Sequence, residues 1–258
     1  MVRWIRCLWV AALTLAGGGD AFAADTRAFE LRTYVTNEGK LPNLLARFRD
    51  HTCALFARHG MENIGYWVPL DPADGSSNTL IYLIAHQSRD AAKENWKGFQ
   101  ADPEWKAARE ASEASGKILA KAPESMFFSL TDYSPVIAPG PSGADRVFEL
   151  RTYQAAPGKF EALNSRFRDH TMALFAKHGI TSVGYWSAAD PAQGGGGTLL
   201  CLLTHPSREA GVAAFKSFQA DPDWIAAKAA SERDGVLTVQ GGAAKSILLR
   251  PTDFSQLK

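Results

Sequence analysis

The sequence predicts an α+β fold. Two ferredoxin-like repeats, each with the element order β-α-β-β-α-α-β, are expected to pair their sheets into an α/β barrel within one chain. Residues 29–34, FELRTY, recur unchanged as residues 148–153, so that Phe29 and Phe148 lie 119 residues apart. Each copy also holds the same order of expected strands and helices. The sheet of one such repeat carries helices on one face only, and a second copy is the most economical cover for the other face.

The internal repeat extends over most of the chain. The same offset aligns four further motifs: residues 47–52 with 166–171, 65–67 with 184–186, 71–73 with 190–192, and 99–103 with 218–222. Each copy is far longer than a solenoid repeat, so the chain is a domain duplication. We predict a first repeat at residues 24–134, a Pro- and Gly-rich linker at 135–145, and a second repeat at 146–258.

Periodicity and capping residues place the elements within the first copy. Residues 29–34 alternate between apolar and polar side chains, as a strand does. Residues 41–59 carry an apolar stripe at helical spacing, and Gly60 suits the left-handed position that ends a helix. Ser88 and Asp102, the latter followed by Pro103, are expected to cap two further helices. The remaining strands are expected at residues 64–68, 79–85 and 125–130, with a turn at 71–78.

Residues 1–23 have the pattern of a secretory signal peptide. Arg3 and Arg6 precede an apolar stretch at residues 7–16, and Ala21-Phe22-Ala23 fits a cleavage site before Ala24. The apolar stretch is shorter than the roughly 20 residues that a membrane-spanning helix needs. We therefore expect an exported protein, periplasmic or secreted, without stable membrane insertion.

Composition and motifs argue against several classes of protein. The formal net charge is +1 and the basic residues are scattered, so the sequence predicts no nucleic-acid partner. It contains no HExxH or CxxC motif, so no metal site is predicted, and no glycine motif for a nucleotide. The cofactor is therefore left unknown. Cys53 and Cys201 occupy unrelated positions of the two copies and are expected to be free thiols.

The first strand of each copy carries the main candidates for ligand binding. Glu30, Arg32 and Tyr34 share one face of this strand, as do their counterparts Glu149, Arg151 and Tyr153. If the apolar face packs on the helices, the polar face points into the space between the two sheets. There Arg32 and Arg151 either bind a carboxylate or enolate as catalytic residues, or each forms an Arg–Glu pair that orders the barrel mouth. Either partner would offset the cost of a buried charge.

Histidines and tryptophans provide further candidates. His51 and His170 lie at the border of the helical stripe and are candidate catalytic bases, because histidine titrates near neutral pH. The alternative is a histidine that is hydrogen-bonded to the backbone. His59 and His178 are most simply helix caps, and His86 and His205 close the third strand of each copy. Trp67 and Trp186 are candidates for the aromatic lining of a ligand cavity.

Taken together, the repeated motifs resemble the NIPSNAP family, seen twice. The motifs are Phe-Glu-Leu-Arg-Thr-Tyr, Gly-Lys, Arg-Phe-Arg-Asp-His, His-Gly, Gly-Tyr-Trp and Ala-Asp-Pro-Glu-Trp, and they fall within residues 29–133 and 148–254. The resemblance implies the dimeric α/β-barrel superfamily, which includes cofactor-independent monooxygenases, haem-handling enzymes and small-molecule isomerases. The family has no agreed catalytic residues to carry over. Its animal members are linked to mitochondria and vesicle traffic, whereas this sequence carries an export signal.

Two functions remain open on the sequence alone. In the first, the protein binds or transforms a small organic molecule in the cavity between the repeats. In the second, it is a non-catalytic structural or interaction barrel. A deep cavity with converging polar residues would favour the first function. A cavity plugged by Trp and Leu, with Arg32 closed in a salt bridge, would favour the second. An intrachain barrel is compatible with a monomer that is a pseudo-dimer and with a homodimer.

Overall fold

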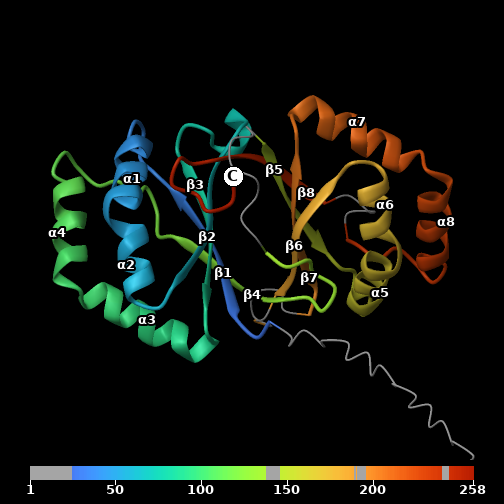
Figure 1. Ribbon diagram of the computed structural model, residues 1–258, viewed down its shortest axis with the longest axis horizontal. Helices are drawn as coiled ribbons and strands as arrows, with labels where there is room; N and C mark the ends of the chain where they lie inside the picture. The colour runs from blue at the N-terminus through green and yellow to red at the C-terminus, as the bar shows by residue number, and fades with distance from the viewer. Residues whose placement is uncertain (1–24, 138–145, 189, 191–195, 240–243) are drawn as a thin grey trace, which may run out of the picture.

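The computed structural model describes residues 25–137, 146–188, 190, 196–239 and 244–258. The predicted signal peptide and most of the predicted linker lie outside these residues. Figure 1 shows the strands gathered in the centre of the molecule, with the helices of the first repeat on one side and those of the second repeat on the other.

The predicted element order is present in both repeats. The first repeat contains β1 Ala28–Val35, α1 Leu41–Arg47, α2 Cys53–Arg58, β2 Glu62–Pro69, β3 Thr79–His86, α3 Arg89–Ala101, α4 Pro103–Ser112 and β4 Glu124–Leu130. The second repeat contains β5 Val147–Gln154, α5 Phe160–Arg166, α6 Met172–Lys177, β6 Thr181–Ala188, β7 Thr198–His205, α7 Arg208–Gln219, α8 Pro222–Ser231 and β8 Lys245–Pro251.

The predicted helix caps are confirmed. The Ser88 hydroxyl accepts a hydrogen bond from the Ala91 amide at 3.0 Å, where α3 begins. The Asp102 carboxylate accepts one from the Glu104 amide at 2.8 Å, where α4 begins with Pro103. Each bond satisfies a backbone donor that has no partner within the helix.

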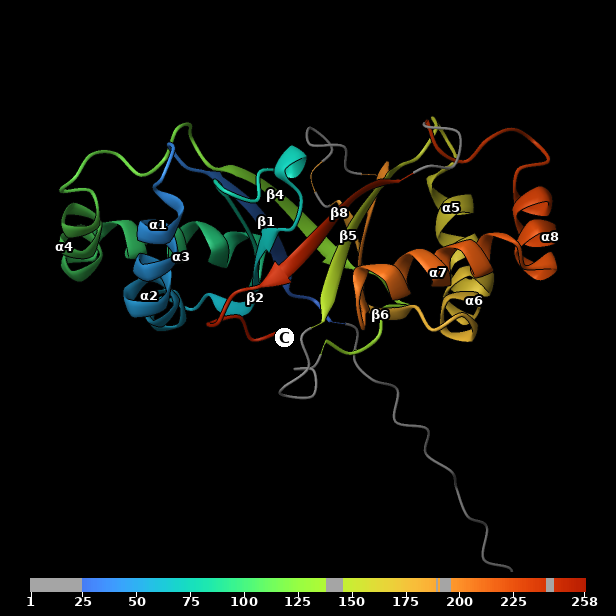
Figure 2. The same ribbon diagram turned by 90° about the horizontal axis from the view of Figure 1, so that it is seen from above.

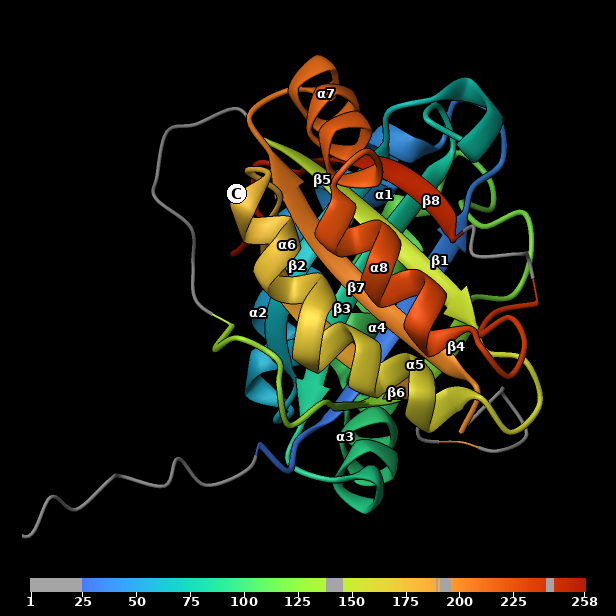
Figure 3. The ribbon, with the colours of Figure 1, turned by 90° about the vertical axis from the view of Figure 1, so that its right-hand side faces the viewer.

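The strands close into one antiparallel barrel in the order β1-β3-β2-β8-β5-β7-β6-β4. Two pairings, β2 with β8 and β4 with β6, join the repeats. Figure 2 shows the barrel from above, between α1–α4 and α5–α8, and Figure 3 shows α5–α8 laid across the strands of the second repeat. The predicted intrachain barrel is therefore confirmed.

The segment after the last strand of each repeat packs on the other repeat. The Thr131 amide donates to the Tyr185 carbonyl at 3.0 Å, and the Thr252 amide donates to the Tyr66 carbonyl at 2.9 Å. Beyond these bonds, Tyr133 packs in the core between the sheet and the helices of the second repeat, and Phe254 packs in the equivalent core of the first repeat. This reciprocal exchange ties the two repeats together beyond the strand pairings.

The helix predicted over residues 41–59 is interrupted. A π-helical turn at Phe48–Thr52 separates α1 from α2, and a second one at Phe167–Thr171 separates α5 from α6. The Thr52 hydroxyl donates to the Arg47 carbonyl at 3.2 Å, which supplies a side-chain partner within the wide turn. Phe48 and Thr52 face the core while residues 49–51 face solvent.

The expected orientation of the first strand was wrong. Phe29 lies in the barrel interior with Trp67, Trp186 and Phe148, in a core that both repeats share. Tyr34 lies instead in the core between the sheet and the helices of the first repeat. Both faces of this sheet are covered, so apolar and polar alternation does not say which face meets the helices. The shared interior requires apolar side chains from both copies, and the polar set turns outward to the helices.

Among the described residues, no helix is both long and apolar enough to cross a membrane. Cys53 is half-buried, Cys201 is buried, and both are free. This agrees with the prediction that the two thiols are independent.

Candidate ligand sites between sheet and helices

Each repeat holds a cavity between the outer face of its sheet and the helices that cover it. The two cavities have volumes of about 660 Å³ each. Seven pairs of identical residues at equivalent positions line them, one member in each cavity: Arg32 and Arg151, Tyr34 and Tyr153, Arg47 and Arg166, Phe99 and Phe218, Gln100 and Gln219, Trp105 and Trp224, and Glu113 and Glu232. We call them the first and second sheet–helix cavities. Their size is in the usual range for small-molecule sites.

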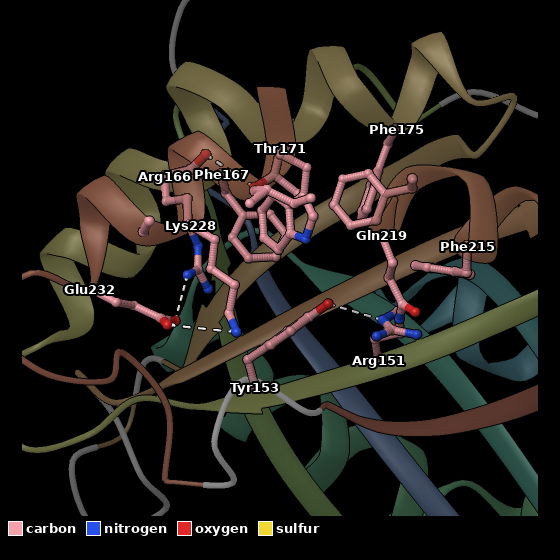
Figure 4. A pocket seen from close by; sticks show the side chains of 14 residues that line it. Arg151, Tyr153, Arg166, Phe167, Thr171, Phe175, Phe215, Gln219, Lys228 and Glu232 are labelled. Carbon is pink, nitrogen blue, oxygen red and sulfur yellow. Dashed lines mark hydrogen bonds and ion pairs between the residues drawn. The ribbon is translucent and has the colours of Figure 1, made fainter. Parts of the chain in front are cut away.

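Figure 4 shows the second sheet–helix cavity. Arg151 and Tyr153 rise from β5 at one side, and Arg166, Lys228 and Glu232 gather at the other, with aromatic rings between. The Nε of Arg151 donates to the Tyr153 hydroxyl at 3.0 Å. Burial raises the pKa of Tyr153, an effect that the charge of Arg151 opposes, so the phenol is protonated at neutral pH. The cavity thus offers cations at two ends of an apolar wall.

A buried carboxylate anchors the arginine of the first repeat. Glu30 is 1% exposed and accepts hydrogen bonds from four side chains: Arg32 Nη1 at 2.5 Å, Ser125 Oγ at 2.5 Å, Trp96 Nε1 at 2.7 Å and His86 Nε2 at 3.0 Å. Burial raises the pKa of Glu30, but the hydrogen bond from His86, the charge of Arg32 and the other two donors outweigh it. The resulting pKa is about 2. Arg32 is therefore held by an ionised partner.

The second repeat builds the same anchor with three donors. Glu149 accepts from Arg151 Nη1 at 2.5 Å, Ser246 Oγ at 2.6 Å and His205 Nε2 at 2.8 Å. Phe215 stands at the position of Trp96 and has no donor to give. Burial raises the pKa of Glu149, but His205, Arg151 and Ser246 outweigh it and lower the pKa to about 2. The Arg–Glu pairs considered from the sequence are thus formed, although they lie under the helices and not at the barrel mouth.

A second arginine in each cavity was not singled out in the sequence. The side chains of Arg47 and Arg166 are each 3% exposed, and their guanidinium groups lie over the rings of Trp105 and Trp224 at 5.2 and 5.3 Å. Arg166 pairs with Glu232 at 2.8 Å. Arg47 and Arg166 each begin a copy of the repeated RFRDHT motif. This repetition is the sequence feature that could have identified them as candidates.

Among the described residues that line the sheet–helix cavities, cationic side chains outnumber carboxylates: the first holds one carboxylate, Glu113, and the second one, Glu232. The Nε groups of Arg32, Arg47 and Arg166 are buried and have no hydrogen-bond partner among the described residues. An unsatisfied buried donor costs free energy. The surplus favours an occupant that supplies acceptor oxygens and negative charge.

The histidines occupy places other than those expected of a catalytic base. His51 and His170 are exposed on the outer side of the π-helical turns and line neither sheet–helix cavity. His59 lies at the end of α2, as expected, and its Nε2 lies 2.7 Å from the Asp102 carboxylate. His86 and His205 are the buried donors to Glu30 and Glu149, a role that the sequence did not reveal because the partners are far apart along the chain.

The interior of the barrel is largely filled by side chains. Trp67 and Trp186, expected to line a ligand cavity, are 1% and 0% exposed and pack in the shared core with Leu83 and Leu202. A cavity of about 270 Å³ between the repeats is lined mainly by apolar residues, among them Leu31 and Leu150. The polar faces of β1 and β5 do not reach it. No group of three or more His, Cys, Asp or Glu side chains suited to a metal occurs within the described ranges.

Comparisons with known proteins agree with the fold. The sequence model of the NIPSNAP family matches residues 29–135 and 148–256. A NipSnap homolog from Dictyostelium discoideum is 30% identical over 139 residues, which cover 53% of this chain and 53% of that protein. The chain thus spans about half the length of this curated relative.

Two solved structures share the architecture over nearly the whole chain. An anthrone oxidase-like protein has a TM-score of 0.58 at 13% identity and covers 91% of this chain and 95% of its own. A protein from Lactobacillus acidophilus NCFM with a provisional monooxygenase name has a TM-score of 0.57 at 12% identity, covering 90% and 97%. At these identities the likeness concerns the fold alone.

Proposed function

Since this chain belongs to the NIPSNAP family, with the domain present twice in tandem, we propose that each repeat binds a small organic anion with an aromatic or other apolar body in its sheet–helix cavity. The observation that carries this proposal is the pairing of two arginines with aromatic walls in each of two equivalent cavities. Guanidinium groups suit carboxylates, and aromatic rings suit a flat apolar body. The proposed site therefore lies within each repeat and not between the repeats.

Arg151 is the primary anion contact in the second cavity. It directs Nη1 to Glu149 and Nε to Tyr153, so Nη2 is the group that a ligand oxygen meets. The Tyr153 hydroxyl accepts a hydrogen bond from Arg151, so its own O–H can donate to the same ligand oxygen. The buried Glu149 fixes the guanidinium in place, so little conformational freedom is lost on binding.

Binding is better supported than acid–base catalysis. The described residues that line the second cavity include one carboxylate, Glu232, and this group is paired with Arg166. The candidate bases His51 and His170 lie outside both cavities. The names of the structural neighbours leave oxidation of the bound molecule as a second activity, which oxygen uptake in the presence of a bound probe would reveal.

The alternative of a non-catalytic barrel draws its support from the packed interior and from the Arg32–Glu30 pair. Trp67 and Trp186 fill the space between the repeats, and Arg32 is closed in an ion pair with Glu30. Those are the features expected of a structural barrel. The packed tryptophans lie in the interior, away from the proposed sites. The Arg32–Glu30 pair lies on the outer face of the sheet, where Arg32 still lines the first sheet–helix cavity.

We also propose that the protein is exported, on the pattern of residues 1–23. Expression of the full chain in a Gram-negative host should give a protein in the extracytoplasmic fraction whose intact mass begins at Ala24 or nearby. A full-length mass in the cytoplasmic fraction would contradict export.

The binding proposal is tested with dansylglycine, a compact aromatic carboxylate whose fluorescence rises in an apolar site. We expect two sites per chain. Ala229, which lines the second cavity from α8, is replaced by Trp to fill that cavity, and Ala230 on the same helix is replaced by Trp as a matched control. Ala229→Trp should remove one site and Ala230→Trp none. Absence of dansylglycine binding, or equal loss in both variants, would overturn the proposal.

A further inference from the structure

The second repeat has an outer cavity beside its sheet–helix cavity. This outer cavity has a volume of about 420 Å³, and Glu149, Ser246 and Leu248 lie in its wall. Arg151, Phe215 and Gln219 line both the outer cavity and the second sheet–helix cavity. These three side chains therefore stand between two adjoining spaces, and Arg151 can be approached from either one.

Larger side chains occupy the equivalent positions of the first repeat. Trp96 takes the place of Phe215, and its indole reaches the carboxylate of Glu30 at 2.7 Å. Phe127 lies opposite Glu30 in the strand register, where Leu248 lies opposite Glu149. The Arg89 guanidinium covers the Phe127 ring at 3.4 Å. Two exchanges, Trp to Phe and Phe to Leu, thus accompany the outer cavity of the second repeat.

We infer that the two repeats select ligands by length. The second repeat takes an elongated amphipathic anion, whose aromatic head lies in the sheet–helix cavity and whose acidic chain runs past Arg151 through the outer cavity. The first repeat takes only compact anions. This inference rests on the proposed function and adds the class of ligand and the residues that determine it, Phe215 and Leu248 against Trp96 and Phe127.

The chemistry of the outer cavity suits such a chain. Val212, which is 65% exposed, joins Phe215 and Leu248 as an apolar lining. Lys216 lies at the exposed edge and supplies a cation for the terminal carboxylate. Arg208, also in the wall, is tied to Asp71 of the first repeat at 2.7 Å and is held away from that role.

A pair of probes separates length from charge. Dansylglycine and 11-(dansylamino)undecanoate carry the same fluorophore and the same carboxylate on short and long spacers. Fluorescence titration of the full chain should give two sites for dansylglycine and one for the long probe. Leu248 lines the outer cavity but not the second sheet–helix cavity. The substitution Leu248→Phe introduces the aromatic ring that Phe127 provides in the first repeat. It should weaken binding of the long probe at least tenfold and change the affinity for dansylglycine less than twofold.

The converse change should create a second long-probe site. The double variant Trp96→Phe with Phe127→Leu gives the first repeat the side chains of the second, and a stoichiometry of two for the long probe is expected. Two equal long-probe sites in the original chain, or no effect of Leu248→Phe, would overturn the inference while leaving dansylglycine binding, and so the proposed function, intact. Binding of neither probe would overturn the proposed function and the inference with it. Thermal unfolding of each variant shows whether it is folded.

Discussion

In the first repeat the buried carboxylate of Glu30 accepts hydrogen bonds from four side chains, whereas in the second repeat Glu149 accepts them from three. The missing donor is the indole of Trp96, which Phe215 replaces. The Arg–Glu–His–Ser set is otherwise the same in both repeats. The side chains around this common set differ, and so does the space beside it.

The outer face of the sheet meets two separate requirements, the pairing of buried charge and the shape of the cavity. A charge placed under helices must be paired and hydrogen-bonded, because desolvation of an unpaired ion costs several kcal/mol. Arg, Glu, His and Ser meet that requirement in both copies. The neighbouring apolar positions have no charge to pair. The volumes of their side chains determine the shape of each cavity.

The largest effect should come from removing the arginines. Arg151→Met leaves Glu149 buried with two donors, whereas Arg32→Met leaves Glu30 with three. Loss of one partner of a buried ion pair costs about 3–5 kcal/mol, so Arg151→Met should lower the free energy of unfolding by that amount. Arg32→Met should cost about 1–2 kcal/mol less, because Trp96 remains as a donor.

Urea unfolding at neutral pH measures both variants. Equal losses of unfolding free energy in the two variants would show that the Trp96 indole does not compensate for the missing cation. The two carboxylate sites would then not differ in stability.

Acid should weaken both anchors to the same extent. The pKa of each carboxylate falls from 4.5 to about 2 on folding. A lowered pKa stabilises the fold above pH 4.5, and that stabilisation is lost as the pH falls from 4.5 through 2. It amounts to about 3 kcal/mol for each carboxylate at neutral pH.

The variants Glu30→Gln and Glu149→Gln should therefore each reduce the slope of unfolding free energy against pH in this window. Unfolding measured at pH 6, 4 and 3 against the original chain isolates each group. A slope that neither variant changes would contradict the assigned ionisation.

Removal of the indole donor alone should have a smaller effect. Trp96→Phe converts the first anchor into the three-donor form of the second, and a lost hydrogen bond to a charged acceptor costs about 1.5–3 kcal/mol. Trp105→Phe is the matched control, because its indole N–H meets no acceptor among the described residues. Thermal and urea unfolding should show a larger loss for Trp96→Phe. Equal losses would mean that aromatic volume, and not the hydrogen bond, accounts for the effect.

The smallest effect should come from the exposed rims of the cavities. Lys106 lies at the rim of the first sheet–helix cavity where Ile225 lies at the rim of the second. Lys106→Ile should weaken binding of naphthalene-2,6-dicarboxylate to the first cavity about threefold and binding of 2-naphthoate less. Ile225→Lys should instead strengthen binding of the dicarboxylate to the second cavity, again more than that of 2-naphthoate. Both changes should vanish at high salt, where exposed charges are screened. Titration calorimetry at low and high salt provides the measurement, and a change that survives high salt would argue against a rim charge.

The sequence was sufficient to predict the topology, but it did not predict where the sheet–helix cavities and their charged residues lie. The recurrence of residues 29–34 at 148–153 and the caps at Ser88 and Asp102 depend on local chemistry, and the barrel follows from them. Both faces of β1 are covered, one by the barrel interior and the other by the helices. The alternation of apolar and polar residues therefore does not indicate which face meets the helices. The donors to Glu30 come from β3, α3 and β4, so only the fold brings them together.

The π-helical turns explain a second miss. The insertion of a wider turn at Phe48–Thr52 shifts the phase of the helical stripe, and His51 moves to the exposed side. A helix of uniform pitch had placed it at the border of the core. Such turns are rare and occur within otherwise regular α-helices, so the apolar stripe alone did not predict one.

Under the proposed function, a ligand binds under the helices of each repeat and not between the repeats. A crystal structure of the full chain soaked with dansylglycine tests it most directly. We expect density in the sheet–helix cavities, with the carboxylate within hydrogen-bond distance of Arg151 and of Arg32. Density in the barrel cavity beside Leu31 and Leu150, with both sheet–helix cavities empty of the probe, would contradict it.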